Sequence, residues 1–468
     1  MNTVSGAISN VNTAASNIAG INAFGSRYRV ASSAPGSSLD EGDLYYNTNA
    51  NTLNYYNGSA WAAIQGQTIV ETNLTATSNI GLGSTAVDSI TTGDNNVGLG
   101  DNALTAVTSG DSNTAVGKDS LKTVTTTSDN TALGRSSLNN NTGSSNTAVG
   151  RKALETNTTA SRNTAVGFYA LLGNTTASNN TAMGAYSLAL NTTGNFNAAF
   201  GDTALYTNTT GASNVAVGDH SLYANTTASD NTAIGYSALE DNTTGGQNVA
   251  VGKKALGNNT TADDNTAVGS QALFTNTTGT SNTAIGRAAL KANTTAHANT
   301  AVGYNALYTN TTGAGNTALG KTAMTTNTTG ADNTGLGLGA LYSNTTGARN
   351  TASGYAALYA NTTASNNTAV GWYALVANTT GEVNSAFGNS AMYTNTTGFG
   401  NTAVGKNSLY TNNGNNNTSV GHEALELNTS GSSNVAVGRQ ALEANTTAAN
   451  NTAVGFESLK ANTTGTQN

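Results

Sequence analysis

The 468-residue sequence contains no cysteine and one proline, and only 9% of its residues are charged. Without cysteine, the chain forms no disulfide bond and has no thiol chemistry. The net charge of −7 and the lack of any basic run argue against a nucleic-acid partner. No stretch approaches the roughly 18 consecutive apolar residues of a membrane span. The N-terminus also lacks the basic and apolar regions of a secretory signal peptide. We therefore expect no membrane partner and no Sec-dependent export.

What the sequence does contain is a repeat, which fills the chain from about residue 79 onward. A typical copy is Asn299–Gly315, NTAVGYNALYTNTTGAG, and the glycine that closes NTAVG recurs 23 times between Gly83 and Gly455. Twenty of the 22 steps between these glycines are 17 residues long and two are 16. Such regularity is typical of repeat architectures and excludes an ordinary globular domain. Positions within a repeat are numbered below from this glycine as 0.

Each repeat carries two short apolar segments. Position −1 is large and apolar in 22 of 23 copies and position +4 in all of them, whereas −2 and +3 are always small. The segments are too short and too interrupted by glycine for helices, and Val, Ile and Thr favour strands. Stacked copies can bury what one copy cannot. We therefore predict an all-β, parallel β-solenoid of about 23 coils with both segments as strands, about 105 Å long at roughly 4.8 Å per coil.

Three further features of the repeat carry predictions. Both 16-residue steps lose one residue from the Asn-Thr-Thr segment near +7, so this segment is predicted to be a corner. Asparagine occupies −4 in every copy, which predicts a ladder of side-chain hydrogen bonds between coils. Eighteen corners, Asn157 to Asn462, form glycosylation sequons. We interpret these residues as forming turns and ladders of side-chain hydrogen bonds between coils.

The small residues at −2 and +3 bear on assembly. Neighbouring strand residues face opposite ways, so one face should carry large residues and the other a column of alanines. A column that is always small indicates close packing against another surface. We predict that this surface is a second copy of the rod.

Two different segments precede the repeats. Residues 1–25 place apolar residues at spacings of 4, 3, 4 and 3, an a/d seam that predicts a short coiled-coil helix. A frayed amphipathic helix that docks on something larger is the alternative. Residues 26–66 predict a small β-meander, and the solenoid then takes residues 67–468. The meander strands are expected near Leu44–Tyr46, Leu53–Tyr56 and Trp61–Ile64, with turns at Asn47–Asn51 and Asn57-Gly58.

These two segments together carry a family resemblance. Arg27–Val30, Leu39–Tyr46 and Tyr56–Trp61, together with the preceding AISNVNTAASNIAGINAF, resemble the N-terminal region of tail-fibre proteins from phages of marine cyanobacteria. The resemblance implies a virion protein that is anchored through its N-terminal end.

The repeat carries a second resemblance. Asn163–Gly167 followed by Ala170-Leu171 is similar to the head repeat of YadA-type trimeric autotransporter adhesins. This resemblance implies a homotrimer of left-handed parallel β-rolls. The present repeat is longer in the corner, and the chain lacks the secretion signal and C-terminal membrane anchor of that family.

No catalytic, cofactor or metal constellation is evident. His220, His297 and His422 occupy different positions of the repeat, so they do not converge and are interpreted as surface residues. Gly315–Thr322 matches a phosphate-loop pattern, but the corner that follows it cannot supply the required helix. The carboxylates within Asp40–Asp43 fit a turn better than a calcium site.

Aromatic residues recur at position +5 and are the candidate binding residues. We weigh two roles for them, contact with a glycan and packing across a subunit interface or over the corner, and favour packing. The residues are Tyr206, Tyr223, Phe274, Tyr308, Tyr342, Tyr359, Tyr393 and Tyr410.

Together these features predict a structural, non-enzymatic virion protein, a phage tail fibre or similar appendage. Its N-terminal region would bind other tail proteins, and a homotrimeric rod would present a distal end to a host glycan or receptor. The alternatives are a bacterial surface adhesin of the trimeric autotransporter type, a phage polysaccharide depolymerase and an ice-binding solenoid. We expect a location in the virion, or otherwise outside the cell or at its surface. Because the repeats stop at Asn468, we also expect that a C-terminal segment was removed or that another protein covers this end.

Overall fold

The computed structural model describes residues 27–37, 39–50, 52–64 and 78–468. They divide into two compact units, a small N-terminal sheet and the repeats. The predicted helix over residues 1–25 lies outside the described residues. Within the described ranges, no helix has the length and apolar character needed to cross a membrane.

The N-terminal unit is a four-stranded mixed sheet with the order β1–β2–β3–β4. The predicted meander is present as β2 (Leu44–Asn47), β3 (Thr52–Tyr56) and β4 (Trp61–Ala63), which pair antiparallel in sequence. The sheet contains one strand more than predicted, β1 (Tyr28–Ala31), which pairs parallel with β2. The Asn57-Gly58 turn is confirmed, since the Asn57 side-chain oxygen accepts hydrogen bonds from the backbone N–H groups of Ser59 and Ala60.

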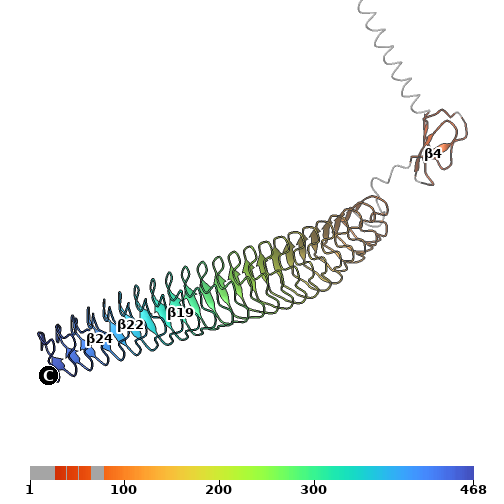
Figure 1. Ribbon diagram of the computed structural model, residues 1–468. Coiled ribbons are helices and arrows are strands. Elements are labelled where there is room, and N and C mark those ends of the chain that lie inside the picture. The colour runs from red at the N-terminus through yellow and green to blue at the C-terminus, as the bar shows by residue number, and fades with distance from the viewer. Residues whose placement is uncertain (1–26, 38, 51, 65–77) are drawn as a thin grey trace, which may run out of the picture. The chain divides into compact units, whose positions relative to one another are not determined.

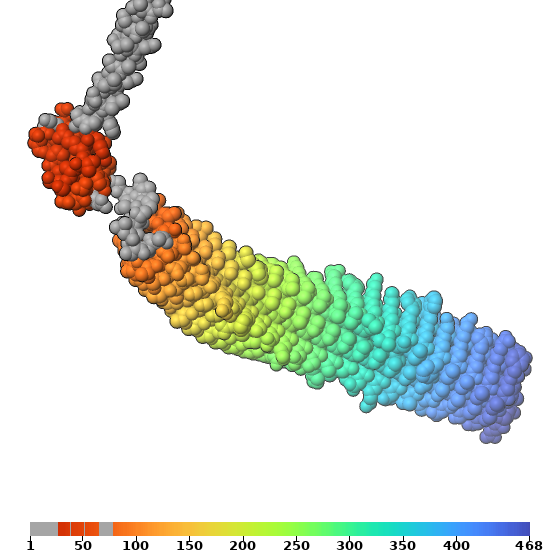
Figure 2. Space-filling model, turned by 180° about the vertical axis from the view of Figure 1, so that it is seen from behind, coloured from red at the N-terminus to blue at the C-terminus, as the bar shows by residue number. Residues whose placement is uncertain are grey.

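The repeats form a parallel β-solenoid, as predicted, and each repeat contributes one three-residue strand (Figure 1). Each strand pairs in register with the strand of the next coil, for example Ala301 opposite Ala318. Figure 2 shows the coils stacked into one continuous rod. The strands are β5 (Ile80–Leu82), β6 (Val97–Leu99), β7 (Thr114–Val116), β8 (Thr131–Leu133), β9 (Thr147–Val149), β10 (Thr164–Val166), β11 (Thr181–Met183), β12 (Ala198–Phe200), β13 (Val215–Val217), β14 (Thr232–Ile234), β15 (Val249–Val251), β16 (Thr266–Val268), β17 (Thr283–Ile285), β18 (Thr300–Val302), β19 (Thr317–Leu319), β20 (Thr334–Leu336), β21 (Thr351–Ser353), β22 (Thr368–Val370), β23 (Ser385–Phe387), β24 (Thr402–Val404), β25 (Thr418–Val420), β26 (Val435–Val437) and β27 (Thr452–Val454).

The second apolar segment of the repeat is not a strand, so that prediction is wrong. Positions +1 to +6, called the turn segment below, form consecutive turns. Positions +2 and +4 have positive φ in coil after coil, as at Asn305 (54°) and Leu307 (54°). The left-handed conformation costs a residue with a bulky side chain roughly 1–2 kcal/mol. Burying a leucine side chain stabilises the fold by about 1.5–3 kcal/mol, which offsets that cost. The turn segment still bonds between coils, because the N–H of Leu307 donates to the carbonyl of Ala323 at 2.9 Å.

The interior of each coil is filled by positions −2, +3 and +4 together. Ala301, Ala306 and Leu307, for example, are all fully buried. The expected division into one large and one small face is therefore wrong, since large leucines and small alanines line the same core. Position −1 instead points outward from the strand, as at Leu319.

The small column at −2 packs inside the coil and not against another rod. A side-chain carbon built on Gly335 would lie 3.0 Å from Cγ of Met324, the +4 residue of the preceding coil. The +4 side chains thus occupy the room that larger −2 residues would need. The alanine column is explained without a partner, and it gives no support to self-association.

Asparagine ladders hold the coils together, as predicted for position −4. Nδ2 of Asn316 and Nδ2 of Asn327 both donate to the carbonyl of Gly330, at 2.8 and 2.9 Å, which ties the corner to the strand. Oδ1 of Asn316 accepts the N–H of Asn333 in the next coil at 3.0 Å. The sequon asparagines from Asn157 to Asn445 are fully buried, which supports their interpretation as corner and ladder residues.

Candidate functional site

The outer face of the solenoid sheet carries a continuous apolar stripe. The stripe is formed by position −1 of the strands from Leu82 to Val454, with Ser353 as its one polar member. Position −3 lies beside it on the same face and is Thr in most coils. Neither position holds a charged residue in any of the 23 coils. Soluble proteins rarely leave an apolar strip of this length without a partner. Its most exposed members are Leu82, Leu133, Met183, Phe200, Val217, Ile234, Ile285, Leu319, Val370, Phe387, Val404, Val420, Val437 and Val454.

The eight aromatic residues predicted at +5 lie in one column of the turn segment. Six of them stack in three nearly parallel pairs with ring centroids 4.9–5.4 Å apart, Tyr206 on Tyr223, Tyr342 on Tyr359 and Tyr393 on Tyr410. Phe274 and Tyr308 instead lie under Lys254 and Lys291, at 5.9 and 5.6 Å. Stacking covers part of each ring face and leaves less of it for an outside ligand. Glycan contact at this column stays a prediction.

A second aromatic column occupies position +1. It has six members, and four of them lie within 6 Å of a cation from a neighbouring coil. These four pairs are Phe168 with Arg151, Tyr236 with Lys253, Tyr304 with Arg287 and Phe456 with Arg439. Cation–π attraction of this kind holds the charged group over the ring face. The other two members, Tyr355 and Trp372, are neighbours and have no such cation among the described residues.

Three carboxylates also gather near the C-terminal end of the described rod. Oxygen atoms of Glu423, Glu426 and Glu443 lie within 4.8 Å of one another. Lys460 Nζ lies 3.0 Å from Glu443, and Gln440 donates to Glu423 at 2.9 Å. Burial, followed by the charges of its two neighbours, raises the pKa of Glu426. Because Lys460 and Gln440 already bind carboxylates of this cluster, we assign no metal ion to it.

The structure also locates the phosphate-loop pattern and two of the histidines. Lys321–Thr326 form the turn segment after β19, so the phosphate-loop pattern is not followed by a helix, as predicted. His220 lies beside Asp219, with 2.7 Å between Nδ1 and the carboxylate, whereas His422 lies beside Glu423 in a coil far along the rod. These two histidines do not converge.

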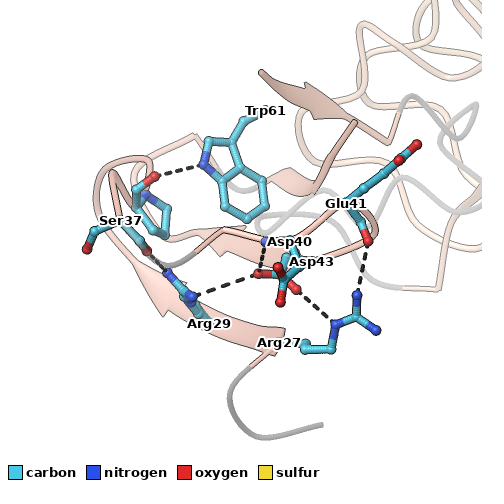
Figure 3. Close-up of polar contacts among 8 residues, drawn as sticks. Arg27, Arg29, Ser37, Asp40, Glu41, Asp43 and Trp61 are labelled. Atoms are coloured by element: carbon cyan, nitrogen blue, oxygen red, sulfur yellow. Dashed lines mark hydrogen bonds and ion pairs between the residues drawn. The ribbon is translucent and has the colours of Figure 1, made fainter. Parts of the chain in front are cut away.

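The small N-terminal sheet is organised around the buried carboxylate of Asp43 (Figure 3). Nε of Arg27 lies 3.0 Å from one carboxylate oxygen, and Arg29 lies 3.8 Å from the other. The backbone N–H of Asp40 donates to the same carboxylate at 3.1 Å. Nearby, the indole of Trp61 donates to the carbonyl of Pro35 at 2.9 Å. The turn interpretation of Asp40–Asp43 fits this arrangement.

Acid should destabilise the small sheet through Asp43. The N–H of Asp40 and the two arginines hold the pKa of Asp43 below its ordinary value of 3.8. A carboxyl group whose pKa is lowered by folding stabilises the folded state fully when the pH is above its ordinary pKa. This stabilisation is lost as the pH falls through the lower, folded-state pKa. We expect the fluorescence of Trp61, read in a Trp372→Phe background, to report loosening of the sheet below pH 3.8.

Two variants separate this cause from general acid unfolding. Asp40→Asn changes an exposed neighbour and should keep the acid transition, whereas Asp43→Asn should remove it and weaken the sheet at neutral pH. An unchanged acid transition in Asp43→Asn would assign it to other groups.

The fold and these surfaces define a β-solenoid repeat protein with an uncharged outer stripe and a small attached sheet. Comparison with protein-family models, curated proteins and solved structures finds no match to this chain.

Proposed function

We propose that this protein is the shaft of a phage tail fibre or a similar virion appendage, with a structural role and no catalytic one. Three copies would align lengthwise with their outer stripes turned toward a common axis. The small N-terminal sheet would bind other tail proteins, and the far end would face the host. The left-handed winding of the coils and the location in the virion are part of this proposal.

The observation that carries the proposal is the outer stripe. It is apolar, uncharged, and repeats once per coil over nearly the whole solenoid. A partner that covers such a stripe must present apolar groups at the same spacing, roughly 4.8 Å. A second copy of the rod meets this requirement by construction, because both surfaces share one period. A closed arrangement of three copies is the assembly that the adhesin resemblance implies.

Lengthwise association also suits a shaft. Each coil is bonded to its neighbours through the strand, the turn segment and two asparagine ladders. Stability along such a rod arises from contacts between neighbouring coils. Burying the stripes of several rods against one another would add resistance to bending.

Sedimentation equilibrium of the full-length chain tests the assembly. We expect a species of three times the chain mass of 46.8 kDa. The triple variant Ile234→Asp, Ile285→Asp, Leu319→Asp places three carboxylates along each stripe and should yield monomers that keep their β circular dichroism. Burying uncompensated charge costs several kcal/mol per site, so the loss of association should be complete.

A matched triple variant gives the control. Tyr236→Asp, Tyr304→Asp and Leu338→Asp change comparably exposed apolar residues that lie outside the stripe, at position +1. This variant should sediment as the unchanged protein does. A monomeric unchanged protein, or dissociation by both variants alike, would refute assembly through the stripe.

The role itself is tested by electron microscopy of virus particles whose genome encodes this chain, labelled with an antibody against the solenoid. Label along a fibre that projects from the particle is expected. Label on bacterial envelopes and not on particles would favour the adhesin alternative.

A further inference from the structure

Tyr355 and Trp372 form an open aromatic platform on the turn segment. Their ring centroids lie 5.7 Å apart at 70°, and the side chains are 45% and 56% exposed. Tyr373 packs against both, with ring centroids 5.3 and 5.8 Å away, and so fixes their orientation. The rings are therefore held in place before any ligand arrives, which lowers the entropic cost of binding.

The platform differs from the other aromatic residues at positions +1 and +5 in having neither a cation nor a parallel ring over its faces. Every other ring at position +1 has a lysine or arginine within 6 Å, and the rings at +5 stack on each other or lie near a lysine. Tyr355 and Trp372 instead follow Leu338 and precede Asn389 in the +1 column, so no cation is within one coil of them in that column.

The surroundings of the platform are neutral and polar. In four consecutive coils, from Leu338 to Tyr393, positions +1, +2 and +5 hold no charged residue. The side chain of Asn389 is exposed in the coil after Trp372, and its Oδ1 accepts the hydroxyl of Ser390 at 2.8 Å. Among the described residues, the Asn389 amide N–H groups have no hydrogen-bond acceptor, so they can donate to a ligand.

We infer that Tyr355 and Trp372 form a carbohydrate-binding platform for neutral pyranose sugars. The C–H face of a pyranose is apolar and packs on an aromatic ring, while its hydroxyls need donors and acceptors at the ring edge. Asn389 and the tyrosine hydroxyls supply those groups. A charged sugar finds no counter-charge here, and a stable protein partner needs about 1,000 Å² or more, which exceeds the area that three rings offer.

This inference goes beyond the proposed function and does not rest on it. The platform lies in the turn segment, whereas the outer stripe lies on the strand. A solenoid that fails to trimerise can still bind sugar, and a trimer can fail to bind it, so the two proposals succeed or fail separately.

Isothermal titration calorimetry with the full-length protein tests the platform. The probes are cellohexaose, maltohexaose and mannohexaose, with oligogalacturonate as the charged comparator. We expect saturable binding of at least one neutral probe and no preference for oligogalacturonate. Trp372→Ala and Tyr355→Ala should each weaken that binding at least tenfold, since each removes a ring face.

Tyr304→Ala is the matched control, because this ring has the same position in the repeat and similar exposure but lies beside Arg287. It should leave the affinity unchanged. Thermal unfolding and sedimentation of all three variants should match those of the unchanged protein, so that a loss of binding is not a loss of fold. Three results would overturn the inference: no neutral probe binds, Trp372→Ala binds as well as the unchanged protein, or oligogalacturonate binds best.

Discussion

Replacing Gly320 with alanine is expected to destabilise the solenoid around that coil by about 3–5 kcal/mol. Gly320 has φ of +138°, a conformation that other residues rarely adopt. An added methyl group would also lie 2.6 Å from the carbonyl oxygen and 2.7 Å from the carbonyl carbon of Gly337. Both atoms belong to the backbone of the next coil, so they can move only if the stacking opens.

Hydrogen exchange measures this effect coil by coil. Because each coil contacts mainly its neighbours, protection should fall in the coils next to Gly320 and persist in distant ones, such as the coil of Gly218. Gly339→Ala is the control, since Gly339 has φ of +66°, the equivalent Ala356 already adopts +52°, and an added methyl group would lie 3.4 Å from its nearest neighbour, the Tyr359 ring. It should change stability by less than about 1 kcal/mol. Equal protection in both variants would show that the close approach at Gly320 is not limiting.

The period of the anchor glycines made the solenoid predictable. Twenty-three copies of a strand-forming triplet at a nearly constant spacing can be buried only by stacking, and the two shortened steps locate the corner. The asparagine ladder was predictable for the same reason, because an invariant polar residue in every coil must satisfy its hydrogen bonds with its own copies.

The conformation of the second segment was not predictable from propensity. Leucine is rarely left-handed, yet Leu307 and its equivalents adopt positive φ because this directs the side chain into the core. A strand and this turn both place one large residue inside the coil, so the sequence pattern alone does not separate them. The tertiary gain from burial outweighs the local cost here.

Which face of the strand is interior depends on the volume of the side chains that the core can hold, and the periodicity of the sequence does not give that volume. Positions −2 and −1 are both apolar, so hydrophobicity permits either choice. The +4 leucines take up most of the narrow core, which leaves room only for a small residue across from them, as at Gly335. The large residues must then face outward, and the stripe that results is the surface on which the proposed assembly depends.

The aromatic platform could have been found by aligning the repeats. Four of the six aromatic rings in the +1 column have a cation in an adjacent coil, whereas Tyr355 and Trp372 are adjacent to each other without a cation beside them. Strand β1 gives no comparable signal. Its parallel pairing with β2 is accompanied by the contacts of Arg27 and Arg29 with Asp43, which join residues 16 and 14 positions apart in the sequence.

Replacing Asn333 with aspartate should cost the solenoid about 3–5 kcal/mol at pH 7, with almost no change in side-chain volume. Nδ2 of Asn333 donates to the carbonyl of Gly347 at 2.8 Å and to Oδ1 of Asn316 at 3.2 Å. An ionised carboxylate in its place would set oxygen against oxygen at both contacts. The site is fully buried, so water cannot compensate, and no cation lies in the asparagine ladder.

The pH dependence of this variant identifies the cause. The introduced carboxyl should have a raised folded-state pKa, because burial and two facing oxygens disfavour its charge. Its destabilisation is therefore present above that pKa and is relieved as the pH falls below it, when the protonated acid can again donate one hydrogen bond. Hydrogen exchange at the coils beside Asn333 should show protection lost at pH 7 and partly regained near pH 4, relative to the unchanged protein at the same pH.

The same substitution at Asn389, which is exposed, removes the amide without burying a charge and should leave the solenoid intact at both pH values. Asn333→Asp would then separate the two things that a buried asparagine provides, an acceptor and a donor, since the carboxylate retains only the acceptor. If Asn333→Asp remains fully protected at pH 7, the ladder is held by its Oδ1 acceptors and backbone alone. In that case, the invariance of asparagine at −4 would have to arise from the backbone conformation before the strand and not from hydrogen bonding between coils.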